Sequence, residues 1–349
     1  TEQYEKAIVA LRKAMQYMDA EPNVYPYGNL GHTYERMGEY GSAYQTYVAL
    51  DERFPNRAST PEDLMHTLTR SGKPEQAIEI CEKEWPVTEP TLAMDRLTNE
   101  FDMYMEVGNM EPCGKLLEEM EQVYNRKSME QFSDYGERKV QYLILSGKYL
   151  EGLSLLKKVV FKVHAACPEG AKNGRKTGMA RLITQYLFLL TIYDDAVKEE
   201  EKPVRKGLFQ KIKDLQKKAE KGEELTPAER RAEFFQTGET YRQWLDDFLK
   251  KNEEMYRDLF FYQKSYLAYF KFISAYFNPD ADVKEALQEM NNSVICRMCR
   301  DNGCVERMVA NALMLERQGD RQGAIEAYRR IDETNPFHLF ARAKLLYMQ

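Results

Sequence analysis

The stretch from Tyr27 to Pro55 places apolar and small residues at steps of three and four, which is the period of an amphipathic helix. Gly38 separates two such runs, at the point where a first helix has to end and the chain has to reverse. Small residues inside each run let two helix backbones approach closely. The stretch therefore predicts a helical hairpin. Its two apolar stripes are Tyr27, Leu30, Gly31 and Tyr34, and Tyr40, Ala43, Tyr47 and Leu50.

The same spacing returns along the chain. Gly72 and Ala77 follow Gly38 and Ala43 by 34 residues. Later copies of the turn glycine are Gly108, Gly147 and Gly319. One hairpin cannot bury its own apolar face, so hairpins that repeat at a fixed interval are expected to stack on one another. The sequence predicts an all-α solenoid of such hairpins, which begins with a second helix alone over residues 4–22.

These residues resemble the repeat of the tetratricopeptide family. The first copy has the family's aromatic, Leu, Gly, Tyr, turn Gly, Ala, aromatic and Pro at Tyr27, Leu30, Gly31, Tyr34, Gly38, Ala43, Tyr47 and Pro55. Leu50 departs where the family has a small residue, and the second copy has Pro61 in place of an aromatic. The resemblance covers about residues 1–160 and 300–349. It implies a right-handed superhelix with a concave groove that binds a peptide or a protein surface.

The period is lost in the middle of the chain. A lysine-rich helix is expected over residues 203–224, and Thr226 with Glu229 has the pattern of a capping box that starts another helix. This second helix carries a coiled-coil-like apolar pattern as far as Phe277 and could run unbroken to that residue. The two helices could pair as a long antiparallel hairpin, or they could be longer members of the solenoid. The predicted parts are an N-terminal array, a long-helix region with a basic loop, and a C-terminal repeat with its cap, at residues 1–160, 161–290 and 291–349.

Composition limits the classes of protein that fit this chain. Charged residues make up 30% and hydrophobic residues 43%, which fits a helical protein with a real core. No run of eighteen apolar residues occurs, so no membrane span is expected. The formal charge of −6 argues against a nucleic-acid binder. Six cysteines are too few for a disulfide scaffold, which favours reduced thiols and a cytoplasmic protein.

Motifs for catalysis and for nucleotide binding are incomplete. Gly170 precedes Lys176 and Thr177 at the distance found in a phosphate-binding loop, but Arg175 stands where the second glycine belongs. We therefore interpret this segment as a solvated loop and expect no cofactor. The four histidines are His32, His66, His164 and His338. None lies beside a nucleophile motif or in an H-E-x-x-H pattern, so no enzyme activity is predicted.

A zinc site is possible in principle but is not expected. Cys296, Cys299 and Cys304 could supply half of the ligands, and His164 with Cys167 could supply the rest. A structural zinc site usually has two paired sets of ligands, and the second set is absent nearby. The first two cysteines also lie in an apparently helical, apolar context, where thiols usually pack as small apolar groups. No metal is predicted.

Charge is uneven along the chain. Between Lys157 and Arg181 there are seven basic residues and one acidic residue. Such a segment could contact an acidic partner or the phosphates of a nucleic acid. Aromatic residues that would stack on bases are not interleaved there, and a solvated loop is the simpler interpretation.

The resemblance also selects candidate binding residues, because the first helices of the hairpins line the groove in this family. Alignment of the first three copies on their turn glycines gives three polar columns, which are Asn29, Asp63 and Asn99, then His32, His66 and Asp102, then Arg36, Arg70 and Glu106. We expect partner contacts from Asn29, His32, Arg36, His66, Arg70, Asn99 and Asp102. Chaperone-binding members of the family have Lys and Asn at the places of Gly28 and His32, so binding of chaperone tails is disfavoured.

Two functions fit these observations. The first is a non-catalytic scaffold that holds a peptide or a partner protein in the concave groove. The alternative is the ligand- or peptide-sensing half of a regulator, with a DNA-binding or signalling domain upstream of Thr1. The sequence indicates neither the partner nor the oligomeric state.

Overall fold

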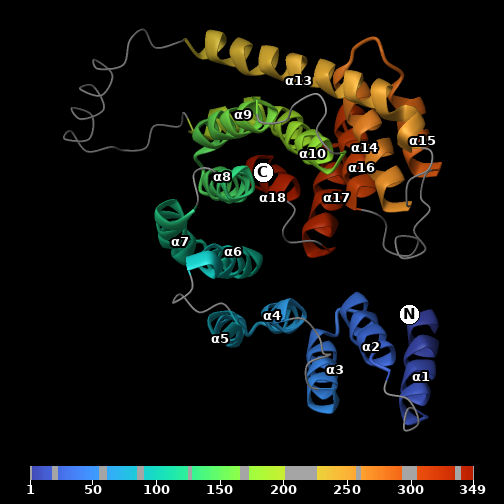
Figure 1. Ribbon diagram of the computed structural model, residues 1–349. Helices are drawn as coiled ribbons and strands as arrows, with labels where there is room; N and C mark the ends of the chain where they lie inside the picture. The colour runs from blue at the N-terminus through green and yellow to red at the C-terminus, as the bar shows by residue number, and fades with distance from the viewer. Residues whose placement is uncertain are drawn as a thin grey trace. The chain divides into compact units, whose positions relative to one another are not determined.

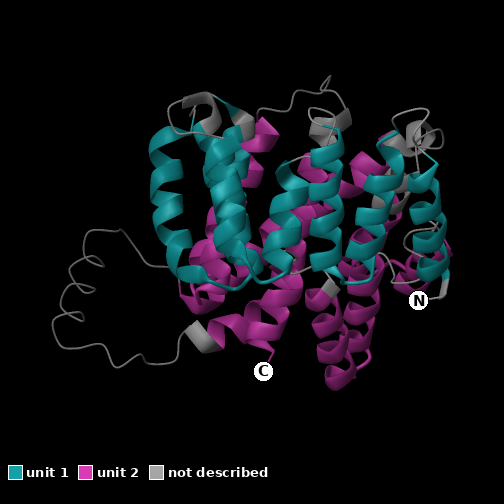
Figure 2. Ribbon diagram, turned by 90° about the horizontal axis from the view of Figure 1, so that it is seen from below, with its two compact units in different colours: residues 1–138 teal, residues 139–349 magenta. Residues whose placement is uncertain are grey.

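The computed structural model describes ten stretches of the chain, which are residues 2–17, 23–54, 61–84, 90–124, 128–165, 173–200, 226–256, 261–292, 305–334 and 339–348 (Figure 1). All regular secondary structure in these stretches is α-helix. The helices divide into two compact units, Thr1–Arg138 and Lys139–Gln349 (Figure 2). The three-part division expected from the sequence stays a prediction.

Unit 1 is a row of helical hairpins. Its helices are α1 (Glu2–Gln16), α2 (Tyr25–Arg36), α3 (Tyr40–Arg53), α4 (Pro61–Arg70), α5 (Pro74–Glu84), α6 (Pro90–Glu106) and α7 (Met110–Val123), followed by α8 (Met129–Leu145), which continues past the end of the unit. The pairs α2–α3, α4–α5 and α6–α7 each pack as a hairpin, and each hairpin packs against the next. The predicted all-α solenoid of hairpins is confirmed. In Figure 1, α2, α4 and α6 follow one another along one side of the row.

Each hairpin turns at a glycine in the left-handed region of the backbone. Gly38 has φ 77°, and the equivalent glycines of the other hairpins lie between 76° and 84°. The amide of Glu39 donates to the carbonyl of Tyr34 at 2.9 Å, and the amide of Gly38 donates to that of Glu35 at 3.0 Å. These two bonds satisfy carbonyls that the end of α2 would otherwise leave open. The predicted position of the turn is therefore confirmed.

Two glycines of the first hairpin should respond to alanine in opposite directions. Gly38→Ala should lower the free energy of unfolding by about 1–2 kcal/mol, because an L-residue is strained at this positive φ. Gly28→Ala should raise it by about 0.5–1 kcal/mol, because Gly28 lies within α2 and an added Cβ meets nothing within 4 Å. Urea titration followed by helical circular dichroism measures both changes. Equal effects of the two substitutions would contradict the assigned turn.

The core of the first hairpin forms around a close contact between α2 and α3. A Cβ added to Gly31 would lie 2.4 Å from the Tyr47 ring, so glycine is needed where the two helices meet. Ala43 is 0% exposed and packs with Leu30, Tyr34 and Tyr47. The lone helix α1 covers this cluster with three partly buried residues, which are Ile8, Leu11 and Met15.

Unit 2 joins the middle of the chain to its C-terminal hairpin. After the end of α8 it contains α9 (Tyr149–Ala165), α10 (Asn173–Leu190), α11 (Tyr193–Glu200), α13 (Pro227–Tyr256), α14 (Phe261–Phe277), α15 (Val283–Asn292), α16 (Val305–Arg317), α17 (Arg321–Thr334) and α18 (Leu339–Tyr347). Helix α10 packs against α9, α13 and α14. The hairpin α16–α17 has its turn at Gly319, as predicted, and α18 packs back onto α10 and α11.

The central region differs from the expected unbroken helix. Helices α13 and α14 are separate and pack against each other, with the Ser274 hydroxyl on α14 donating to Asp246 on α13. The predicted capping box is confirmed, because the Thr226 amide donates to the Glu229 carboxylate at 2.8 Å and the Glu229 amide donates to the Thr226 hydroxyl at 3.2 Å. The lysine-rich segment 203–224 lies outside the described residues.

The basic segment is more helical than its sequence predicts. Helix α9 extends to Ala165 and α10 begins at Asn173, so Lys176 and Thr177 belong to a helix rather than to a solvated loop. Among the residues that the structure describes, no helix combines the length and the apolar character needed to cross a bilayer.

Candidate functional site

The predicted binding residues lie on the first helices of the hairpins, and one group of them connects α4 to its neighbours. Arg70 donates from Nη2 to the Tyr40 hydroxyl at 2.9 Å, with its guanidinium 4.8 Å from the centre of that ring. Its Nε lies 3.4 Å from Oε1 of Glu106, which is buried on α6. Arg70 is itself mostly buried, so its charge interacts with the neighbouring hairpin. Its side chain lies beneath the exposed residues of this face.

His66 stands beside this group and is 43% exposed. Its Nδ1 lies 3.9 Å from Oε1 of Glu106, and its ring meets the Tyr40 ring edge-on. Burial lowers the pKa of His66 below the ordinary value, against the opposing effect of the Glu35 carboxylate. A neutral imidazole is therefore favoured near pH 7, and it can both donate and accept a hydrogen bond.

His32 is tied to the core of the first hairpin. Its Nδ1 lies 2.9 Å from the hydroxyl of Tyr47 and 3.0 Å from Oε2 of Glu35, while 51% of its side chain is exposed. Without a proton, Nδ1 accepts from the Tyr47 hydroxyl, and with one it donates to Glu35. Burial raises the pKa of Tyr47, and the Glu35 charge adds to the increase, so this hydroxyl keeps its proton at neutral pH.

A second pair crosses between hairpins at Asp102. Arg138 on α8 donates from Nε to Oδ1 at 3.0 Å and from Nη2 to Oδ2 at 2.6 Å, which is a two-bond contact between planar groups. Arg138 was not among the predicted residues. It lies nine positions before Gly147, as Asn99 lies nine before Gly108, so extending the first polar column into the fourth copy would have found it.

The remaining predicted residues differ in exposure. Asn29 and Arg36 are exposed on α2. Asn99 is half-buried, and its amide donates to the carbonyl of Asp95 in the same helix at 2.9 Å. The structure thus brings His66, Arg70 and Glu106 together and joins Asp102 to Arg138. The half-exposed histidines and the polar groups of α2 form the accessible part of this face.

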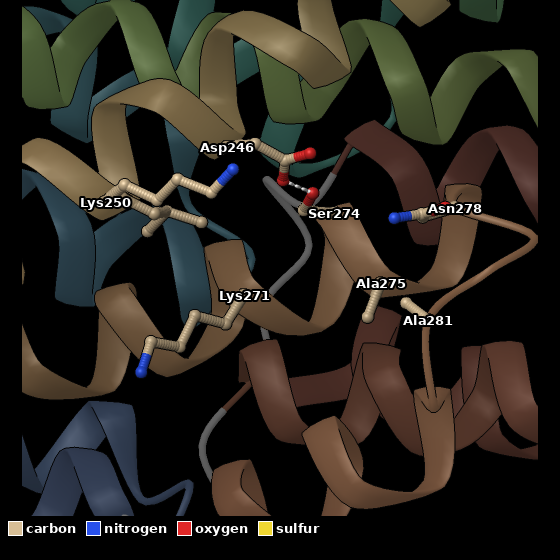
Figure 3. A pocket seen from close by; sticks show the side chains of 8 residues that line it. Asp246, Lys250, Lys271, Ser274, Ala275, Asn278 and Ala281 are labelled. Carbon is tan, nitrogen blue, oxygen red and sulfur yellow. Dashed lines mark hydrogen bonds between the residues drawn. The ribbon is translucent and has the colours of Figure 1, made fainter.

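A cavity of about 240 Å³ lies between α13 and α14 in unit 2 (Figure 3). Its polar lining residues are Asp246, Lys250, Lys271, Ser274 and Asn278. Asp246 accepts from Arg242 at 2.6 Å and from Ser274, and Lys271 pairs with Glu289 at 3.0 Å. Since Asp246 and Lys271 are paired within the unit, the lining of the cavity indicates no particular ligand.

Metal ligands do not gather in the described part of the chain, where no three His, Cys, Asp or Glu side chains are placed to hold an ion. Cys167, Cys296, Cys299 and Cys304, the thiols considered for zinc, lie outside the described residues. His164 is described, and its ring meets the Trp244 ring edge-on.

Comparison with known families agrees with the geometry of the first hairpin. The sequence model of the tetratricopeptide repeat matches residues 24–57, which include α2, the Gly38 turn and α3. Residues 24–57 are a tetratricopeptide repeat. A comparison with curated proteins finds no match. The hairpins α4–α5 and α6–α7 share the turn geometry of the matched repeat.

Proposed function

We propose that the chain is a non-catalytic scaffold that binds an extended peptide, or an extended segment of a partner protein, on the face formed by α2, α4 and α6. The observation that carries this proposal is that polar residues occupy equivalent positions on the first helices of successive hairpins. Equal positions of successive hairpins place polar side chains on neighbouring first helices, and pairs such as Arg70 with Glu106 lock these helices to one another. A rigid row of this kind holds its exposed groups in fixed positions for a partner.

The exposed groups indicate the chemistry of the partner. Arg36, Asn29 and the two half-exposed histidines are hydrogen-bond donors, so a backbone carbonyl or a carboxylate of the partner would suit them. Glu35 and Asp63 lie close enough to influence the pKa values of Tyr47 and His66, and they limit how much negative charge the face accepts. We therefore expect an extended segment with at least one acidic residue.

A random peptide library displayed on phage and selected on the full chain tests this proposal. Peptides that bind this face should lose about 1–2 kcal/mol of affinity in the double variant Arg36→Ala, His66→Gln, as is typical of polar contacts in an interface. Binding should also weaken as the salt concentration rises, because the groups are partly exposed. Selected peptides that bind the double variant as tightly as the parent would place the site elsewhere.

Gln45 and Arg70 differ in their contacts, so their substitutions test different things. Gln45→Ala is the matched control, because Gln45 is exposed on α3, the second helix of its hairpin. Arg70→Ala is unsuitable, since Arg70 contacts Tyr40 and Glu106 and its loss would disturb the packing of α4 against α3 and α6. A change in binding by that variant could not be assigned to the partner.

The described thiols support a reducing compartment such as the cytoplasm. Cys81 and Cys113 are free and buried, and burial raises the pKa of each thiol to about 12. Such thiols pack as small apolar groups and are unreactive near neutral pH.

A further inference from the structure

Helix α9 carries a large aromatic side chain on its surface. Phe161 is 69% exposed, more than any other large apolar side chain described in unit 2. Leu156, Val159 and Val160 of the same part of α9 are buried. Phe161 thus adds little to the core of unit 2, and most of its ring is accessible to a partner.

Phe161 lies at the seam between α9 and α13. Residues 157, 161 and 164 share one stripe of α9, because they are four and three positions apart. The Lys157 carbonyl accepts from the Tyr241 hydroxyl at 3.2 Å, and the His164 ring meets the Trp244 ring edge-on with 6.4 Å between centroids. Contacts with α13 therefore flank Phe161 on both sides, and Figure 1 shows α13 running alongside α9.

Two lysines lie next to Phe161 on the surface of α9. Lys158 and Lys162, three positions before it and one after it, are both exposed. Lys157 pairs with Glu233 of α13, so its charge is offset within the unit. Two exposed lysines thus lie beside the apolar side chain of Phe161.

We propose that this surface, formed by Phe161, Lys158 and Lys162 of α9 beside Trp244 of α13, docks an acidic segment of a partner protein that also carries an apolar side chain. The apolar side chain packs on Phe161, and acidic residues on either side of it meet the two lysines. The surface lies in unit 2, so the proposal is independent of the α2, α4 and α6 face in unit 1.

Two other occupants fit less well. A helix that lies in a membrane interface inserts a continuous apolar face, whereas Leu156, Val159 and Val160 of α9 are buried in the core. A nucleic acid is bound by several aromatic side chains interleaved with basic ones, and this part of α9 exposes a single aromatic in a chain of net charge −6.

The phage-displayed random peptide library, selected on the full chain, also tests this surface. One class of enriched peptides should combine acidic residues with Leu, Phe or Trp, and Phe161→Ala and Lys158→Glu should each weaken its binding by about tenfold. Leu346→Ala is the matched control, because Leu346 is an exposed apolar residue of unit 2 on another helix, α18. Unchanged helical circular dichroism and melting temperature would show that each variant is folded, as the exposure of both side chains predicts.

Several results would overturn the proposal. The first is that no enriched peptides combine acidic and apolar residues. The second is that Phe161→Ala leaves the binding of such peptides unchanged. The third is that phosphatidylserine vesicles or single-stranded DNA bind in a Phe161-dependent way in place of such peptides. Peptides that respond to the Arg36→Ala, His66→Gln variant but not to Phe161→Ala report on the unit 1 face. The failure of one proposal can therefore be told apart from the failure of the other.

Discussion

Ala43→Asp should lower the free energy of unfolding of unit 1 by about 2–5 kcal/mol, enough to unfold the first hairpin at room temperature. Ala43 is 0% exposed, between α2 and α3, where it packs with Leu30, Tyr34 and Tyr47. A carboxylate at this position would lose its water, and the side chains recorded around it are apolar or aromatic. The carboxylate would either remain charged without a partner or take up a proton, and either state costs free energy of folding at neutral pH.

A matched substitution in the same helix separates this effect from that of the added charge. Gln45 is exposed two positions further along α3, and Gln45→Asp should change the free energy of unfolding by less than about 0.5 kcal/mol. Urea unfolding of the full chain, followed by helical circular dichroism, compares the two variants. Similar stabilities would mean that Ala43 is not at the contact between the helices and that the hairpin is assigned incorrectly.

The local features of the fold could be predicted because short stretches of sequence determine them. A glycine at the end of an apolar run is needed for the left-handed turn, and all five predicted turn glycines have a positive φ. The capping box of Thr226 and Glu229 likewise depends on residues three positions apart. In such cases each local preference agrees with the final fold.

The apolar pattern before Phe277 shows where local sequence becomes ambiguous. The pattern continues from α13 into α14, which favours one long helix when read along the chain. It continues because each of the two helices buries a face, partly against the other. Periodicity identifies a buried face but does not identify the element that covers it.

The sequence predicts which residues occupy equivalent positions of successive hairpins, but not which of them contact each other. Alignment on the turn glycines placed Arg70 and Glu106 in one column, and the structure shows that they contact each other across two hairpins. Whether a polar side chain reaches its neighbour or the solvent depends on the spacing of the helices and on its rotamer, which the sequence does not state. The sequence predicts that Arg70 and Asp102 contact a binding partner. In the structure each of them contacts a residue of a neighbouring hairpin.

The packing of α18 was the hardest feature to predict, because the residues that it contacts are far from it in the sequence. Tyr347 donates from its hydroxyl to the Ile144 carbonyl at 2.6 Å, across 203 positions of the chain. Lys344 of the same helix is 1% exposed, whereas a lysine in an amphipathic pattern is normally assigned to the solvent face.

Lys344→Ala should destabilise unit 2 by about 3–5 kcal/mol, because it removes one partner of a buried ion pair. Lys344 Nζ lies 2.6 Å from Oε2 of Glu316 on α16 and 3.5 Å from the Thr191 carbonyl, which ties α18 to two separate parts of the unit. The Tyr328 hydroxyl donates to the other oxygen of Glu316. Without the lysine, the Glu316 carboxylate would keep this one donor and lose its counter-charge, and a cavity would remain at the position of the lysine stem.

A double-mutant cycle separates the ion pair from the packing of the stem. Lys344→Met keeps most of the volume of the side chain, and Glu316→Gln removes the charge that would be left unpaired. The double variant should therefore be more stable than the sum of the two single changes predicts, by about 1–3 kcal/mol. Leu346→Ala, at a 43% exposed position of the same helix, is the control for a change in α18 away from the pair. If Lys344→Ala cost no more than Leu346→Ala in urea unfolding, the ion pair would not be what holds α18 in place.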